Sequence, residues 1–131
     1  MDRHQVNSTC PTVSPWIPLA VCLSSDRANN RIQIFDQDGN FLAEWKQFGR
    51  PSGVYIRDDI IYVADSQSDE KTNPPFRQGI RIGSVKDGKV TAFMPQMGPK
   101  LAMPEGLAAD KNGNVFGGFA TDMDFKKFAK N

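Results

Sequence analysis

A pattern of short strands and turns, punctuated by glycine and proline, repeats about two and a half times along the 131 residues of this chain. Its clearest copy spans residues 26–45 and reads as a turn, a strand, a tight turn and a second strand. Much of segment 50–65 returns at 103–117, where Pro104 corresponds to Pro51. Pro51 and Pro104 are 53 residues apart. This separation exceeds the roughly 40–45 residues typical of a four-stranded repeat, because one turn is enlarged. Such a repeat constrains the fold more than any single residue does.

The hydrophobic pattern predicts an all-β chain. No stretch shows the 3.6-residue period and the caps of a helix, whereas short alternating runs recur from Leu19 onward. The turns at 36–40, 85–89 and 110–114 each place glycine where a hairpin needs a positive φ, so consecutive strands should form an antiparallel meander. The ten expected strands span 19–24, 31–36, 41–46, 53–57, 60–64, 79–84, 89–94, 105–109, 114–119 and 124–129.

Two strands indicate how the sheets should pack. Ile32 and Ile34 alternate with polar residues, which predicts a strand with one buried face. Residues 60–64 are apolar on both faces, which is typical of a strand between two neighbouring sheets. Residues 1–18, rich in proline, serine and threonine, predict an irregular arm that precedes the β domain over 19–131.

Composition excludes several classes of protein. The net charge is +1, from 16 basic and 15 acidic residues, so we expect no nucleic-acid partner. The longest apolar stretch, 16–23, contains Pro18 and is too short to span a bilayer. Cys10 and Cys22 allow a disulfide loop in an oxidising compartment. The sequence favours the alternative that Cys22 is a small buried apolar residue, and without a CxxC spacing it gives no metal signal.

One combination of residues resembles a known repeat. It comprises Asn29-Asn30-Arg31-Ile32-Gln33-Ile34-Phe35-Asp36, Gly39, Phe41, Trp45, Pro51, Gly53 and Tyr62-Val63-Ala64-Asp65. This combination is similar to the NHL repeat of six-bladed β-propellers, and the likeness covers about residues 21–129. Within that superfamily, the chain most resembles the C-terminal part of bacterial proteins related to the peptidyl-α-hydroxyglycine α-amidating lyase domain.

The resemblance implies a partial β-propeller of about two and a half four-stranded antiparallel blades. One complete blade is expected at about 53–94, with three strands of the preceding blade before it and three strands of the next after it. A ring left open should expose apolar flanks at Ile60–Ala64 and Val115–Phe119. It should also leave an open edge at 125–129, so that self-association through open blade edges is expected.

The family's chemistry is harder to place on this chain. The resembled lyase binds zinc through several histidines, and a catalytic zinc site usually needs about three protein ligands. His4 is the only histidine, and no Gly-x-Ser-x-Gly elbow is present. We therefore predict no catalytic, cofactor-binding or metal-binding residue, with a divalent cation (calcium or zinc) bound only in a complete ring. The resemblance implies a secreted or periplasmic protein, although no convincing signal peptide precedes the repeats.

The expected binding surface is the long-loop face, which we define as the end of the sheets that carries the turns at 26–30, 47–52, 65–78, 95–103 and 120–123. Long connections are where binding usually resides. Asp26 and Asp65 end equivalent strands, and each either helps to hold a cation or accepts N–H bonds from its own turn. The candidate residues of this face are Asp26, Arg27, Asn29, Arg50, Asp65, Gln67, Arg77, Met97 and Glu105.

Two functions from different classes follow. The first is a non-catalytic binding or scaffold fragment of a propeller, which contacts a protein or peptide partner through the long-loop face. The alternative is a fragment of an amidating lyase-like enzyme that is active only in a complete ring. A metal site with glyoxylate release from a hydroxyglycine-extended peptide would distinguish the second from the first. A chain with no independent activity is the third possibility.

Overall fold

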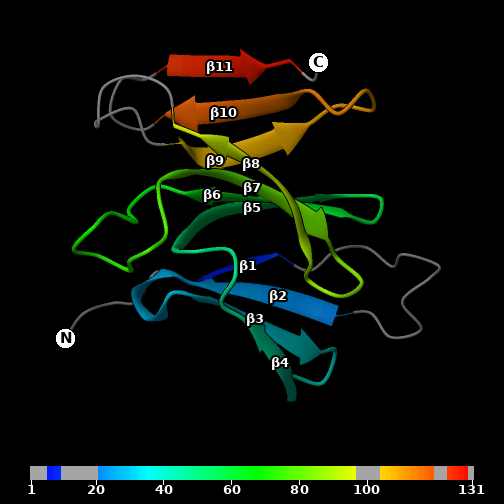
Figure 1. Cartoon of the computed structure of the whole chain (residues 1–131). Helices are drawn as coiled ribbons and strands as arrows, with labels where there is room; N and C mark the ends of the chain where they lie inside the picture. The colour runs from blue at the N-terminus through cyan, green and yellow to red at the C-terminus, as the bar shows by residue number, and fades with distance from the viewer. Residues whose placement is uncertain (1–5, 10–20, 97–103, 120–123, 130–131) are drawn as a thin grey trace.

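The structure is a computed structural model that describes residues 6–9, 21–96, 104–119 and 124–129, and these residues form three antiparallel sheets (Figure 1). The first sheet contains β1 (Val6–Thr9), β2 (Val21–Asp26), β3 (Arg31–Asp36) and β4 (Phe41–Trp45). The second contains β5 (Pro51–Arg57), β6 (Ile60–Asp65), β7 (Gly79–Ser84) and β8 (Val90–Pro95). The third contains β9 (Pro104–Ala109), β10 (Val115–Phe119) and β11 (Asp124–Phe128).

Each sheet is a meander in which strands that follow one another in sequence lie side by side. All ten expected strands are present, with ends shifted by no more than about two residues, and the all-β class is confirmed. The only helical element among the described residues is a single 3₁₀ turn, η1 (Arg27–Asn29). Within that part of the chain, no helix is long and apolar enough to cross a membrane.

The first sheet has one strand more than the sequence indicated. β1 pairs with β2 in the register Val6 with Asp26 and Thr9 with Leu23. The expectation of an irregular arm is therefore wrong for Val6–Thr9, and the first sheet, like the second, has four strands. The prolines that argued against a strand here, from Pro11 onward, follow β1 and leave its ladder of backbone hydrogen bonds intact.

The interpretation of Cys22 as a free buried residue is also wrong. Cys22, in the second position of β2, is disulfide-bonded. The only other cysteine of the chain, Cys10, lies outside the described residues.

The second sheet lies between the other two, as Figure 1 shows. Its face toward the first sheet packs Ile61 and Val63 against Leu23, Ile32 and Ile34. Its opposite face packs Tyr62 and Ile80 against Ala109 and Val115 of the third sheet. Because β6 has a neighbour on both faces, its apolar side chains are needed on both, as the sequence predicted.

This packing corrects the expected apolar flanks. Residues 61–64 of β6 are buried and only Ile60 is exposed, at 42%. Val115 and Phe119 at the two ends of β10 are also buried. The sandwich of three sheets covers these side chains, so a complete ring is not needed to bury them. The large apolar side chains that remain exposed among the described residues are Phe41, Leu42, Ile60, Phe93 and Phe125.

The connection from the first sheet to the second crosses the interface between them. Phe48 is fully buried there, against Gly83 of β7. The centre of its ring lies 5.9 Å from the centre of the Trp45 ring. Gln47 donates a hydrogen bond of 2.8 Å to the carbonyl of Gly88. The connection between β4 and β5 therefore fills the interface between the first two sheets with the ring of Phe48.

Two hairpin turns use the same chemistry. The Asp36 carboxylate accepts the backbone N–H groups of Asp38 and Asn40 at 2.9 and 2.8 Å. The Asp110 carboxylate accepts those of Asn112 and Asn114, both at 2.9 Å. A glycine at φ 83° or 82° completes each turn, as expected for a left-handed position. The first aspartate of each turn thus fixes a hairpin through the same bonds.

These turns should make the fold sensitive to acid. Hydrogen bonds from the side chains of Asn40 and Asn114, followed by backbone bonds, hold the pKa values of Asp36 and Asp110 below the usual 3.8. A carboxylate with a lowered pKa stabilises the fold above its unfolded pKa, and that stabilisation is lost as the pH falls through the folded pKa. The urea midpoint should therefore fall as the pH drops below about 4.

The double variant Asp36→Asn, Asp110→Asn is the matched comparison, because asparagine keeps an oxygen acceptor in each turn but does not titrate. Its urea midpoint should decline less steeply between about pH 4 and pH 2 than that of the wild type. If the urea midpoint declined equally with pH in the variant and in the wild type, the acid sensitivity would not come from these turns.

Candidate functional site

Three connections meet on the long-loop face. Arg50, just before β5, donates from Nη1 to the Asn30 side-chain oxygen at 2.8 Å and from Nη2 to the Gln67 side-chain oxygen at 3.1 Å. Asn30 lies between η1 and β3, and Gln67 follows β6. One guanidinium therefore joins the β2–β3, β4–β5 and β6–β7 connections, because its planar fork can bond two acceptors at once.

The longest connection, residues 66–78, is held from within. The buried Asp65 carboxylate accepts the backbone N–H groups of Gln67 and Ser68 at 3.2 and 2.9 Å. Asp69 then accepts those of Lys71 and Thr72 at 2.8 and 2.6 Å. Aspartate suits these positions because its short carboxylate reaches the backbone two and three residues ahead. The segment consequently has a defined shape although it contains no strand or helix.

A buried ion pair lies beneath this connection. Arg81 of β7 donates from Nη1 to the Asp65 carboxylate at 3.0 Å, and from Nη2 to the Arg77 carbonyl at 3.0 Å. The Arg81 side chain is 8% exposed, and burial lowers its pKa although Asp65 opposes this shift. Its guanidinium carbon lies 4.9 Å from the ring centre of Phe76 and 4.6 Å from that of Phe93. The pair joins the long connection to the centre of the second sheet.

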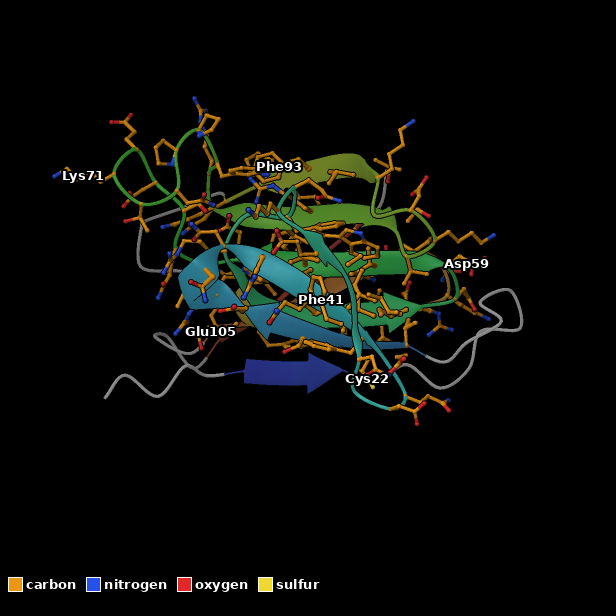
Figure 2. The ribbon with its side chains drawn as sticks, turned by 90° about the horizontal axis from the view of Figure 1, so that it is seen from below. Cys22, Phe41, Asp59, Lys71, Phe93 and Glu105 are labelled. Carbon is orange, nitrogen blue, oxygen red and sulfur yellow. The ribbon has the colours of Figure 1, made fainter. Side chains whose placement is uncertain are left out.

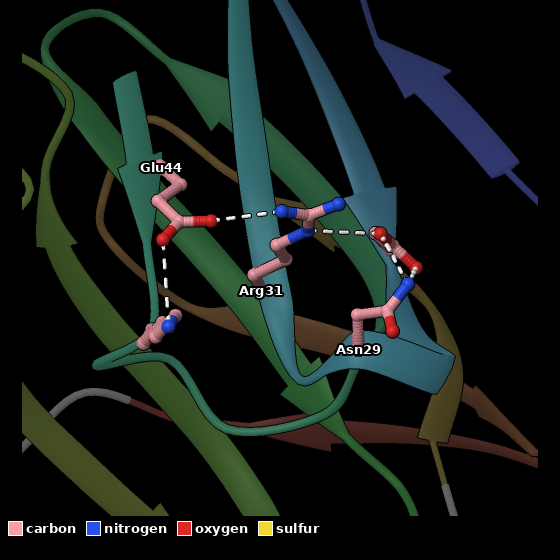
Figure 3. A network of polar contacts seen from close by, with 5 residues as sticks. Asn29, Arg31 and Glu44 are labelled. Atoms are coloured by element: carbon pink, nitrogen blue, oxygen red, sulfur yellow. Dashed lines mark hydrogen bonds and ion pairs between the residues drawn. The ribbon is translucent and has the colours of Figure 1, made fainter.

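A second polar network connects β2, β3 and β4 (Figure 3). Asn29 donates to both carboxylate oxygens of Asp26, and Arg31 bonds Asp26 and Glu44, each at 2.9 Å. Glu44 also pairs with Lys46 at 3.4 Å. Burial alone would raise the pKa of Asp26, but the bonds from Asn29 and Arg31 outweigh it and the pKa is lowered. The Asp26 carboxylate is therefore charged, and both of its oxygens accept hydrogen bonds within this network.

The predicted site residues separate into three groups. Asp26 and Asp65 are buried and hold the connections in place, so they offer little surface to a partner. Arg27, Arg50 and Gln67 are half-buried, while Asn29, Arg77 and Glu105 are exposed. Figure 2 places Glu105 and Lys71 toward one end of the sheets and Asp59 toward the other. Met97 lies outside the described residues.

Of the two interpretations of Asp65, the turn-bonding one is confirmed by its bonds to Gln67 and Ser68. Within the described residues, no group of three or more His, Cys, Asp or Glu side chains is arranged to hold a metal ion. Two buried polar atoms on the long-loop face, Arg50 Nε and Ser66 Oγ, have no hydrogen-bond partner in the described part of the chain.

Sequence reasoning missed Asn30 and Arg81. Asn30 adopts a left-handed conformation at φ 56°, which asparagine tolerates better than most residues, and its position before a strand was the available signal. Arg81 stands between Ile80 and Ile82 in a strand that packs on both faces. A charged residue in such a strand is a signal that a buried partner exists.

Comparison with known proteins adds no assignment. No protein-family model matches the chain, and no curated protein matches it. The fold and the long-loop face thus define an all-β protein of three antiparallel sheets whose connections are cross-linked at one end.

Proposed function

We propose that this chain is part of an NHL-like β-propeller and that it acts as a non-catalytic binding or scaffold module for a protein or peptide. Three successive meanders packed face to face support the propeller, since this is how neighbouring blades are arranged. The repeat of Pro51 and Gly53 as Pro104 and Gly106 supports it as well, because these residues lie in the first strands of the second and third sheets.

The bridge that Arg50 makes between Asn30 and Gln67 is the observation on which the proposed binding role rests. Connections that are already fixed lose little conformational entropy when a partner binds, so that more of the contact energy appears as affinity. Within the described residues, the opposite end of the sheets carries the tight hairpins at 36–40, 57–59, 85–89 and 110–114, whose backbone groups bond mainly to one another.

The exposed residues of the long-loop face indicate the kind of partner. Arg77 and Lys71 are basic, Glu70 and Glu105 are acidic, and Asn29 both donates and accepts hydrogen bonds. A surface with both signs of charge and neutral polar groups suits an extended peptide that carries charges of both signs better than it suits a uniformly charged polymer.

Selection from a random peptide library displayed on phage tests this proposal. Selected peptides should bind the variant Arg77→Glu about tenfold more weakly than the wild type, because a positive charge becomes negative at the contact. The variant Lys111→Glu is the matched control, since it makes the same charge change at an exposed position in a hairpin at the other end of the sheets. Its affinity should be unchanged.

Two results would contradict the proposal. One is a set of selected peptides that respond to Lys111→Glu and not to Arg77→Glu. The other is release of glyoxylate from a hydroxyglycine-extended peptide together with stoichiometric zinc, which would replace the binding role with the lyase alternative.

A further inference from the structure

The second and third sheets enclose a cleft that the long-loop face does not include. Its volume is about 500 Å³, within the range of small-molecule sites. It is lined by residues of β6, β7 and β8 in the second sheet and by Phe128 at the end of β11 in the third. Side chains of Ile82, Ala92 and Met94 belong to this lining, and apolar atoms predominate in it.

The equivalent place in the first interface is filled by an aromatic side chain. Trp45 pairs with Ile32, the second residue of β3, and Met94 pairs with Ile80, the second residue of β7. Met94 therefore occupies in the second sheet the position that Trp45 occupies in the first. Trp45 packs against the core between the first two sheets, where the buried Phe48 also lies. Met94 is smaller than Trp45, and it lines the cleft between the second and third sheets.

A tyrosine is among the polar residues in the wall of this cleft. Tyr62 of β6 lines it and is 3% exposed, and burial raises the pKa of its phenol. Its hydroxyl is not among the buried polar atoms of the described residues that lack a hydrogen-bond partner, which are Ser25 Oγ, Arg50 Nε, Arg57 Nε and Ser66 Oγ. A tyrosine hydroxyl in the wall of a cleft is a hydrogen-bond donor for a molecule that enters it.

The charge at the cleft is already compensated. Asp59 at the mouth pairs with Lys86 at 3.2 Å. The remaining described lining is apolar or neutral, from Ile60, Gly83, Ser84, Thr91, Gly113 and Ala129. An ion that entered would lose its hydration without gaining a counter-charge, so a neutral molecule is favoured.

We propose that this cleft binds a small neutral aromatic molecule that carries one hydrogen-bond acceptor, with its ring between Met94 and Phe128 and its acceptor on the Tyr62 hydroxyl. The site is separate from the long-loop face, and the proposal does not rest on the proposed peptide-binding role.

The test uses 6-acetyl-2-(dimethylamino)naphthalene, a neutral fluorescent probe with one ketone, whose emission shifts to shorter wavelength in apolar surroundings. The whole chain should bind it and shift its emission. Met94→Trp should remove binding, because the indole fills the space as Trp45 fills the first interface. Leu42→Trp is the matched control, since Leu42 is an exposed residue of β4 that does not line the cleft. That variant should bind like the wild type.

Tyr62→Phe tests the polar contact separately from the space. It should weaken probe binding by about three- to tenfold, the value of one neutral hydrogen bond. If thermal unfolding shows that Met94→Trp does not fold, Ala92→Leu narrows the cleft more gently and should weaken binding as well. A wild-type chain that does not bind the probe, or equal binding by wild type and the folded narrowed variant, would overturn the proposal.

Discussion

Replacing Asp65 with alanine should lower the free energy of unfolding by about 3–5 kcal/mol, as measured by urea denaturation. The substitution leaves the Arg81 guanidinium buried without its counter-charge, and Arg81 donates to Asp65 at 3.0 Å in the wild type. It also removes the acceptor of the Gln67 and Ser68 N–H groups, so that the start of the long connection loses its turn. Both effects lower the free energy of unfolding.

Lys86→Ala is the control for the loss of an ion pair as such. Lys86 pairs with Asp59 at 3.2 Å, but the two side chains are 53% and 36% exposed. Loss of an exposed pair of this kind should cost no more than about 1 kcal/mol. Adding Arg81→Met to Asp65→Ala should restore part of the stability, because the unpaired charge is then gone. Equal costs for Asp65→Ala and Lys86→Ala would show that the buried pair is not an important stabilising contact.

Phe48→Ala should have an effect of similar size, a loss of about 3–5 kcal/mol in the free energy of unfolding. Phe48 is fully buried in the interface between the first and second sheets, where it packs against Gly83 and lies beside Trp45. Removing its ring leaves a cavity that β-sheets on both sides cannot easily close. The urea midpoint should fall while the native circular dichroism spectrum is retained at low denaturant.

Phe41→Ala is the matched control, since it removes the same ring from a position on β4 that is 53% exposed. Its ring contacts Phe35 edge to face, at 6.0 Å between ring centres, and it should contribute much less than Phe48. A loss from Phe41→Ala as large as that from Phe48→Ala would mean that the segment after β4 does not close the interface.

Sequence reasoning predicted some elements of this fold and missed others. The strand pattern of β2 to β11 was readable because period-two alternation and turn residues act over a few neighbours. β1 was missed because Val6–Thr9 shows no strong alternation, and its pairing with β2 depends on a strand that follows eleven intervening residues. The long-loop face was predicted as a region, but which of its residues are exposed was not. Asp26 and Asp65 are buried acceptors, whereas Arg77 and Glu105 are exposed.

The sequence by itself determined the all-β class, the order of the hairpins and the glycine positions of their turns, because each follows from residues that are close together in the chain. Only the tertiary structure decided that Asp65 would meet Arg81, that Arg50 would bridge Asn30 and Gln67, and that Met94 would leave a cleft where Trp45 fills one. These contacts depend on which face of one sheet meets which face of the next. That choice is made by the summed packing of many side chains, and no local pattern records it.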